Sequence, residues 1–382
     1  MNPLRSLPLG YCANVHPGPG LARLLDGVME TAPAVAASLR EDGSLGERDP
    51  FPIGLWLSDE ASRELAQPGE AEALRDRLRR RGIVVGGLNG FPFGDFHDRI
   101  VKHAVYEPHW ADPRRLDFTV RLAEVLARLV PEGTVSSGVT TVPIGWRAAF
   151  EDAGRVEAAK SSLAEAIEAL RAIRDRTGVL VHLDLEPEPG CLLERASEAA
   201  EFIASVHERA GTPEAREFLR ACHDVCHAAV LFEEQEASLA AYRERGVQIG
   251  RVQVSSAIAF DGTANDFRAL RPFDEPRWLH QTAMLEGNGR VHFYEDLPKA
   301  IDEAPEGFWR IHFHVPVFAA SLGKVETTRE EIAECLGALR VDDGCDFLEV
   351  ETYAWSALPP SLRPTSLEAG IAEEIRYVRG LI

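Results

Sequence analysis

Short hydrophobic runs alternate along the chain with longer segments in which apolar residues recur at helical spacing. The runs predict strands over residues 7–15, 52–58, 82–88, 134–142, 179–186, 218–225, 249–255, 309–318 and 347–353. The longer segments predict helices over residues 21–39, 58–81, 112–129, 156–173, 194–209, 230–245 and 366–379, and another from residue 328 onward. Residues 257–308 show neither pattern, and we expect them to be irregular.

Strands that alternate with helices in this way are typical of a parallel sheet, either a barrel or a doubly wound sheet. No Gly-x-Gly-x-x-Gly motif follows a predicted strand, so nothing supports a dinucleotide-binding fold. Polar residues at almost every strand end favour an α/β fold of the (β/α)8 TIM-barrel type with extended loops. One strand more is predicted than a barrel needs, so we expect the strand at 249–255 or 309–318 to lie partly outside it. No change of composition marks a linker, which predicts a single domain over residues 1–382.

The chain is strongly acidic, with a formal net charge of −20 over 382 residues. This charge argues against nucleic acid and anionic membranes as partners. The arginine-rich segment 75–81 is interpreted as a solvated helix end. The start of the chain lacks the apolar segment of a secretory signal, no apolar run is long enough to span a membrane, and the cysteines do not form a disulfide scaffold. These features predict a cytoplasmic protein without membrane insertion.

The segment 179–190 carries the clearest sign of chemistry. Its alternating start predicts a strand on which His182, Asp184 and Glu186 share one face. Three ionisable groups on one face of a buried strand are costly unless a metal, a substrate or mutual pairing satisfies them. Pro187 and Pro189 cannot donate to a sheet ladder, so they end the strand. Glu186 is therefore predicted to be the last inward residue before the loop, at the catalytic end of a barrel.

Two other strand ends combine ionisable residues at short spacing. Asp224 is followed by His227, which suits a divalent cation or a proton relay, and equally a helix cap beside a hydrogen-bonded core histidine. His312 and His314 share one face of their strand, and paired inward imidazoles favour metal or substrate binding over a structural hydrogen bond. The pattern does not decide which of these two histidines faces the site.

Glu349 and Glu351 also share a strand face, and Glu351 is nearer the end that would carry the site. For both, an ion pair with a neighbouring basic residue is the structural alternative. Gln253 ends a further strand, where it can hold a hydroxyl or a metal-bound water. The loop residues that can line a pocket are Asn14, His16, Asn89, His97 and His280, and a surface role is the alternative for each.

Together these positions supply carboxylates and imidazoles without a thiolate. Oxygen and nitrogen ligands of this kind suit Mn²⁺, Mg²⁺, Co²⁺ or Zn²⁺. Such a metal can clamp two adjacent oxygens of a sugar and stabilise an enediolate, while two glutamates move the proton. The sequence therefore predicts a divalent-metal cofactor of undetermined identity.

The order Glu186, Asp224-x-x-His227 and a late strand glutamate resembles the xylose isomerase-like TIM barrels, which include sugar isomerases, sugar epimerases and the endonuclease IV proteins. Within that superfamily the chain is similar to the EboE group of metabolite traffic proteins, encoded in ebo gene clusters. The segments that carry this similarity are Leu9-Gly-Tyr-Cys-Ala-Asn-Val-His16, Asn89-Gly-Phe-Pro-Phe-Gly-Asp-Phe-His97, His182-Leu-Asp-Leu-Glu-Pro-Glu188, Cys222-His-Asp-Val-Cys-His227, His312-Phe-His-Val-Pro316 and Leu348-Glu-Val-Glu-Thr-Tyr353.

The resemblance implies a barrel whose metal is held by Glu186, Asp224, a histidine and Glu351, with the two glutamates also acting as catalytic acid and base. The chain departs from the superfamily at Gln253, where the ligand histidine is expected. Either a histidine from the next strand takes its place or the metal site is altered. Of the two histidines on that strand we expect His312 as the ligand, with His314 as the alternative. The EboE group also implies a role in moving a secondary-metabolite precursor, with other ebo-cluster proteins as partners.

The leading hypothesis is a divalent-metal-dependent isomerase or epimerase that acts on a small polyhydroxylated or carbonyl metabolite. The side chains expected to contact this substrate are His16, Asn89, His182, His227, Gln253, His280 and His314. One alternative is a non-catalytic carrier that uses the same pocket to hold a metabolite. The other is an endonuclease IV-like phosphodiesterase with a multi-zinc site, which the acidic charge disfavours.

Overall fold

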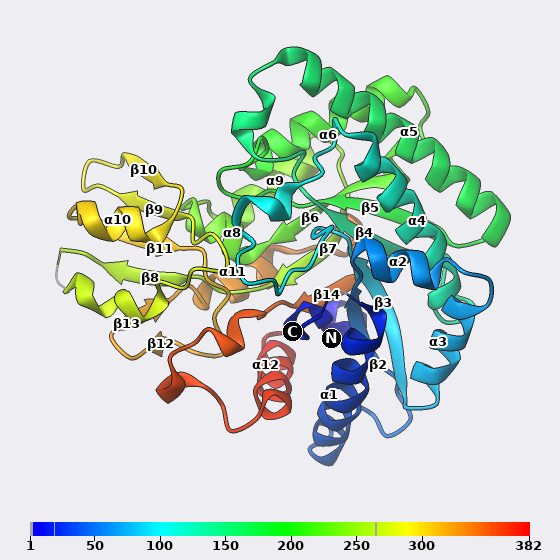
Figure 1. Ribbon diagram of the computed structural model, residues 1–382, viewed down its shortest axis with the longest axis horizontal. Coiled ribbons are helices and arrows are strands. Elements are labelled where there is room, and N and C mark those ends of the chain that lie inside the picture. Colours follow the sequence, from blue (N-terminus) through cyan, green and yellow to red (C-terminus); the bar gives the residue numbers. More distant parts are fainter. Residues whose placement is uncertain (1–2, 19, 264–265) are drawn as a thin grey trace.

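The computed structural model describes residues 3–18, 20–263 and 266–382. Parallel strands close into a barrel in the order β1-β14-β7-β6-β5-β4-β3-β2 (Figure 1). These strands are β1 (Leu9–Cys12), β2 (Phe51–Trp56), β3 (Ile83–Asn89), β4 (Ser136–Thr141), β5 (Leu180–Leu185), β6 (Leu219–Asp224), β7 (Ile249–Val254) and β14 (Phe347–Val350). The predicted (β/α)8 barrel is therefore confirmed.

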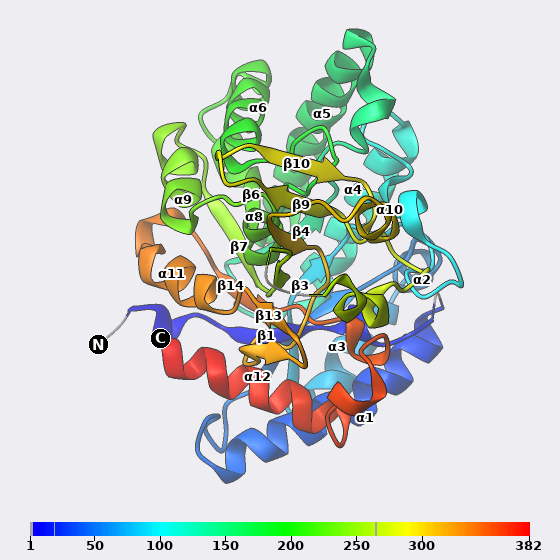
Figure 2. The same ribbon diagram turned by 90° about the vertical axis from the view of Figure 1, so that its left-hand side faces the viewer.

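Helices follow the barrel strands and pack around the outside. They are α1 (Leu21–Glu41), α2 (Asp59–Leu65), α3 (Glu70–Arg79), α4 (Pro113–Leu129), α5 (Ala153–Thr177), α6 (Ala196–Ala210), α7 (Ala215–Phe218), α8 (Val225–Val230), α9 (Gln235–Glu244), α11 (Glu330–Ala338) and α12 (Leu367–Leu381). Ser58 and Asp112 cap α2 and α4 with side-chain oxygens. The first and last of these helices, α1 and α12, lie side by side and complete the ring (Figures 1 and 2). Within the described residues, no helix combines the length and apolar character that a membrane span requires.

A six-stranded antiparallel sheet is inserted between β7 and β14. In spatial order its strands are β10 (Val291–Tyr294), β9 (Thr282–Leu285), β11 (Phe308–Ile311), β8 (Ile258–Asp261), β13 (Val325–Thr327) and β12 (Ser321–Leu322). Figure 1 shows this sheet beside the barrel, together with the short helix α10 (Leu297–Glu303), and Figure 2 looks onto it from its own side. We call residues 255–329 the insertion.

The insertion decides one prediction and corrects another. Of the two strands of which one was expected to lie partly outside the barrel, 249–255 is barrel strand β7. At 309–318 only Phe308–Ile311 is a strand, and it pairs with β8 and β9. Beyond Ile311 the backbone leaves the ladder, as the N–H of His312 donates to Gln281 and that of Val315 to Ser256. Residues 257–308, expected to be irregular, contain β8, β9 and β10. Each of these strands has only 4 residues, too few to show an alternating pattern.

Two helix boundaries also differ from the predictions. The helix expected from residue 58 to the arginine-rich segment is two helices, because Pro68 and Gly69 interrupt it and Gly69 adopts a φ of +83°. The helix expected from residue 328 begins at Glu330, and the hydroxyl oxygen of Thr328 accepts the N–H of Ala257 at 2.9 Å instead of capping it. This hydrogen bond instead ties the start of the insertion to its end.

An ion pair fills part of the barrel interior below the strand ends. The Arg251 guanidinium donates to Glu349 at 2.8 Å, and both side chains are almost completely buried. Glycines make room for this pair, because a Cβ at Gly54 would collide with Glu349 and one at Gly87 with Arg251. Glu349 thus has the structural role that was its alternative in the sequence, and it holds β14 two residues before Glu351.

Glu374 on α12 is buried against the chain that follows β14. Its Oε1 accepts the hydroxyl of Thr352 at 2.6 Å and the N–H of Val317 at 3.1 Å, while burial raises the pKa of Glu374 to about 8. In an unfolded chain the pKa of a glutamate is ~4.3. The folded protein therefore favours the protonated acid. This contribution to stability is fully present below pH ~4.3 and is lost as the pH rises through the folded-state value.

The substitution Glu374→Gln should remove this pH dependence. We expect the variant to gain stability relative to the wild type between about pH 5 and about pH 8, because the amide can keep both hydrogen bonds without ionising. Urea unfolding of the two proteins at both pH values measures the difference in the free energy of unfolding. A difference that is the same at both pH values would contradict the expectation.

Candidate metal centre

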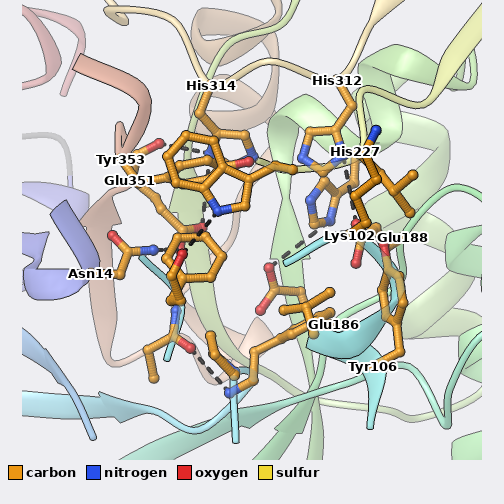
Figure 3. A pocket seen from close by; sticks show the side chains of 17 residues that line it. Asn14, Lys102, Tyr106, Glu186, Glu188, His227, His312, His314, Glu351 and Tyr353 are labelled. Carbon is orange, nitrogen blue, oxygen red and sulfur yellow. Dashed lines mark hydrogen bonds and ion pairs between the residues drawn. The ribbon is translucent and has the colours of Figure 1, made fainter. Parts of the chain in front are cut away.

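A cavity lies at the C-terminal ends of the barrel strands, between the barrel and the insertion (Figure 3). Its free volume is about 60 Å³. The residues that line it are Asn14, Asn89, Phe91, Pro92, Phe96, Lys102, Val105, Tyr106, Glu186, Glu188, His227, Trp278, Leu279, His312, His314, Glu351 and Tyr353. The acids come from the barrel, whereas two of the three histidines come from the insertion. This end of a parallel barrel is where active sites are built.

The two carboxylate oxygens of Asp224, at the end of β6, have different surroundings. Oδ1 accepts the N–H of His227 and the hydroxyl of Ser255, each at 2.8 Å. Oδ2 is buried and has no hydrogen-bond partner among the described residues. The sequence left a helix cap and a ligand as alternatives, and the structure shows a cap on one oxygen and a free second oxygen. A buried carboxylate oxygen without a donor is costly, and a cation would satisfy it.

Glu186 and Glu351 each place an oxygen within 4.8 Å of Asp224 and of each other. Oε1 of Glu351 accepts the side-chain amides of Asn14 at 2.6 Å and Asn89 at 3.1 Å, which fixes the carboxylate. Oε2 of Glu186 is buried, and the described part of the chain gives it no partner. Burial, and after it the neighbouring carboxylates, raises the pKa of both glutamates well above the usual range. Acids crowded in this way need either protons or a cation between them.

The histidines that line the cavity, His227, His312 and His314, are held in one tautomer. Nδ1 of each lies 2.8 Å from a carbonyl oxygen. The acceptors are, in that order, the backbone oxygen of Pro187, the side-chain oxygen of Gln281 and the backbone oxygen of Glu351. Because a carbonyl oxygen can only accept, each Nδ1 carries the proton and each Nε2 a lone pair. Burial lowers the pKa of all three rings, that of His227 to about 4, so they are neutral and able to bind a metal.

The potential ligand atoms form overlapping groups, within each of which they lie less than 4.8 Å apart. Asp224 belongs to one group with Glu186 and Glu351 and to another with His227 and His314. Nε2 of His314 is buried without a hydrogen bond in the described chain and lies 4.0 Å from Oδ2 of Asp224. Free carboxylate oxygens beside a neutral imidazole fit a divalent cation.

The histidines beside Asp224 are thus His227 and His314, each with Nε2 4.0 Å from Oδ2, whereas the sequence favoured His312 as the ligand. His312 belongs to a different group, with Glu188 and His227, and its Nδ1 lies 3.6 Å from Glu188. His312 and His314 both leave the same segment after β11, and that segment is not a strand. The alternation that placed them on one face of a strand therefore does not apply to them.

Three of the side chains expected to contact substrate lie away from the cavity. His16 hydrogen-bonds to the hydroxyl of Tyr11 at 3.0 Å. His280 donates to the backbone oxygen of His312 at 2.9 Å, so it supports the loop that carries a lining residue. His182 lies deeper in the barrel, because its position four residues before Glu186 corresponds to ~13 Å along a strand. Its ring bonds to two aspartates, Asp184 at 2.6 Å and Asp346 at 3.0 Å.

Gln253 also does not line the cavity, although it is paired with Asp224 in the ladder between β6 and β7. Its side chain is completely buried, and the described residues offer no partner to either its oxygen or its nitrogen. Such an amide is satisfied by a water molecule or by a ligand. The expected contact with a metal-bound water stays a prediction. Of the other expected contacts, Asn89, His227 and His314 do line the cavity.

Several lining residues had no predicted role. Oε1 of Glu188 accepts the hydroxyl of Tyr106 at 2.7 Å and the amide of Gln281 at 2.9 Å, and burial raises the pKa of Glu188 to about 7. The ammonium of Lys102 forms an ion pair with Asp296 of the insertion. The strand-end sequence Glu-Pro-Glu offered a signal for Glu188. The sequence offered none for Tyr106 or Lys102, which lie in a loop without a periodic pattern.

No protein-family model matches the chain, and no curated protein matches it. Among solved structures, an L-ribulose 3-epimerase shares 16% identity over 98% of this chain and 93% of that chain, with a TM-score of 0.49. A D-tagatose 3-epimerase-like protein shares 13% identity over 98% and 97%, with a TM-score of 0.49. The IOLI protein with a bound zinc atom shares 13% identity over 97% and 96%, with a TM-score of 0.47. Solved structures similar to the chain thus include sugar epimerases, but likeness at this level concerns the fold alone and is silent on activity and on the EboE group.

Proposed function

We propose that the protein is a divalent-metal-dependent isomerase or epimerase of a small carbonyl compound, with the metal held by Glu186, Asp224, His314 and Glu351. One observation carries this proposal. Free ligand atoms of Glu186, Asp224 and His314 are buried at the C-terminal ends of the barrel strands. Neighbouring groups already orient Asp224, His314 and Glu351, as the hydrogen bonds of Asp224 Oδ1, His314 Nδ1 and Glu351 Oε1 show. Ligands that are orientated before binding are characteristic of metal sites.

A bound cation would supply polarisation of two adjacent substrate oxygens. The remaining task is the movement of one proton, which we assign to Glu186 and Glu351. One carboxylate takes the proton from the carbon beside the carbonyl, and the other delivers a proton to the opposite face of that carbon. If the proton is delivered to the neighbouring carbon instead, the hydroxyl proton also passes to the former carbonyl oxygen. Substrate and product then have the same atoms and electrons, so no oxidant or reductant is needed.

Elemental analysis of the purified protein tests the metal site directly. We expect about one equivalent of Mn, Co or Zn in the wild type and its loss in Asp224→Ala, because the free Oδ2 is removed. Asp117→Ala, which changes an exposed aspartate on α4, is the matched control and should keep the metal. Absence of metal from the wild type after reconstitution would overturn the proposal and favour the non-catalytic carrier.

The same metal analysis also tests the phosphodiesterase alternative, because the cavity contains a second group of potential ligand atoms. Glu188, His227 and His312 could bind a further cation without using Asp224 or His314. Two or three equivalents of zinc, together with binding to abasic DNA at low salt, would support a multi-zinc phosphodiesterase. A single equivalent without DNA binding would exclude it.

The remaining expectations concern the setting of the protein. A small-molecule metabolite as partner, a cytoplasmic location and the absence of nucleic acid and membrane partners remain predictions from composition and charge. Trafficking of a secondary-metabolite precursor, with ebo-cluster proteins as partners, remains an implication of the EboE resemblance. Co-purification with such proteins would test it independently of the metal site.

A further inference from the structure

The cavity has two chemically different sides. One side holds the carboxylates and imidazoles. The other is walled by Phe91, Phe96, Val105, Tyr106, Trp278 and Leu279. Aromatic rings dominate this second side, with the centroid of Phe96 5.4 Å from that of Trp278, and Trp278 5.0 Å from Tyr353. A molecule held between the two sides meets ligand atoms at one end and hydrocarbon at the other.

Three polar groups on the apolar side already have partners within the protein. Nε1 of Trp278 donates to the backbone oxygen of Phe96 at 3.1 Å. The hydroxyl of Tyr106 donates to Glu188 at 2.7 Å, and Lys102 is paired with Asp296. A substrate hydroxyl pointing to this side would lose its hydrogen bonds to water and gain little in exchange.

The size of the cavity leads to the same restriction. Its free volume of about 60 Å³ is enough for on the order of four water molecules. The part of a substrate that the cavity encloses is therefore short. Two independent observations, the chemistry of the wall and the volume, thus argue against an enclosed polyol.

We propose that the substrate of this site is a short α-hydroxycarbonyl compound whose enclosed tail is hydrocarbon and not a chain of hydroxyls. The inference rests on the proposed function, since the metal side would bind the two adjacent oxygens. The aromatic side then selects the tail by excluding water from it. This departs from the polyhydroxylated substrate that the sequence left open.

Two matched probes test the proposal. Both 1-hydroxy-2-butanone and dihydroxyacetone have the same α-hydroxycarbonyl head. The butanone ends in a methyl group where dihydroxyacetone has a hydroxyl. Calorimetric titration of the metal-loaded full chain should show at least ~10-fold tighter binding of 1-hydroxy-2-butanone, the discrimination expected of an apolar pocket against an added hydroxyl. Equal or tighter binding of dihydroxyacetone would overturn the proposal.

The substitution Val105→Thr places a hydroxyl in the apolar wall with little change of shape. It should reduce the preference for 1-hydroxy-2-butanone several-fold, whereas Val291→Thr on β10, outside the cavity, should leave the ratio of affinities unchanged. Metal content of each variant is measured alongside. Normal metal content without binding of either probe would overturn the substrate class while sparing the metal site, and failure of the wild type to take up metal would overturn both.

Discussion

Glu186→Gln should leave the barrel folded while removing most of the bound metal and slowing any substrate proton exchange by ~10²–10⁴-fold. The carboxylate is buried, and its Oε2 has no protein donor among the described residues, so the folded chain loses no internal hydrogen bond there. The amide has a similar shape but lacks the charge that binds a cation and the basicity that accepts a proton. The effect should therefore fall on the chemistry and not on the fold.

The measurements are metal content and incorporation of deuterium from solvent into the carbon next to the substrate carbonyl. Glu201→Gln, which changes an exposed glutamate on α6, is the matched control. Circular dichroism should give the same spectrum for both variants and the wild type. Unchanged metal content in Glu186→Gln would show that the cation, if present, is bound elsewhere.

Glu349→Ala should lower the free energy of unfolding by about 3–5 kcal/mol. The substitution leaves the Arg251 guanidinium, which is 1% exposed, without its carboxylate partner inside the barrel. Denaturant unfolding measures the loss. The double variant with Arg251→Met and Glu349→Leu removes both charges and should recover most of the stability, because a buried ion pair contributes little over apolar residues of similar volume. A loss below ~1 kcal/mol in Glu349→Ala would mean that the arginine finds water or another partner.

The barrel was predictable because each of its strands carries a local signal. Residues 179–186 alternate clearly and end at prolines, and helix caps such as Ser58 and Asp112 mark where the following helices begin. The inserted sheet was not predictable in this way. Its strands are short, and they pair with segments far away in the sequence, for example β11 with β8. Only tertiary contacts define such a sheet, so the local pattern did not decide which of the strands at 249–255 and 309–318 lies outside the barrel.

The residues of the candidate site also differ in whether the local sequence could predict them. Glu186, Asp224 and Glu351 stand at or just beyond the ends of barrel strands, where the topology alone brings them together. The choice between His312 and His314 depends on how an irregular segment of the insertion crosses the barrel mouth, and spacing contains no information on that. Glu188 was not assigned to the site, because the residues after Pro187 no longer alternate as in a strand.

The insertion supplies two of the imidazoles, while the barrel supplies the acids, so neither part alone holds the complete centre. The junction depends on contacts between distant residues, such as Nδ1 of His314 with the backbone oxygen of Glu351 and Ala257 with Thr328. The centre is therefore complete only where the insertion contacts the barrel mouth. A cation held there would link the two sheets through ligands from each. Without it, the insertion should separate from the barrel mouth more easily than the barrel itself unfolds.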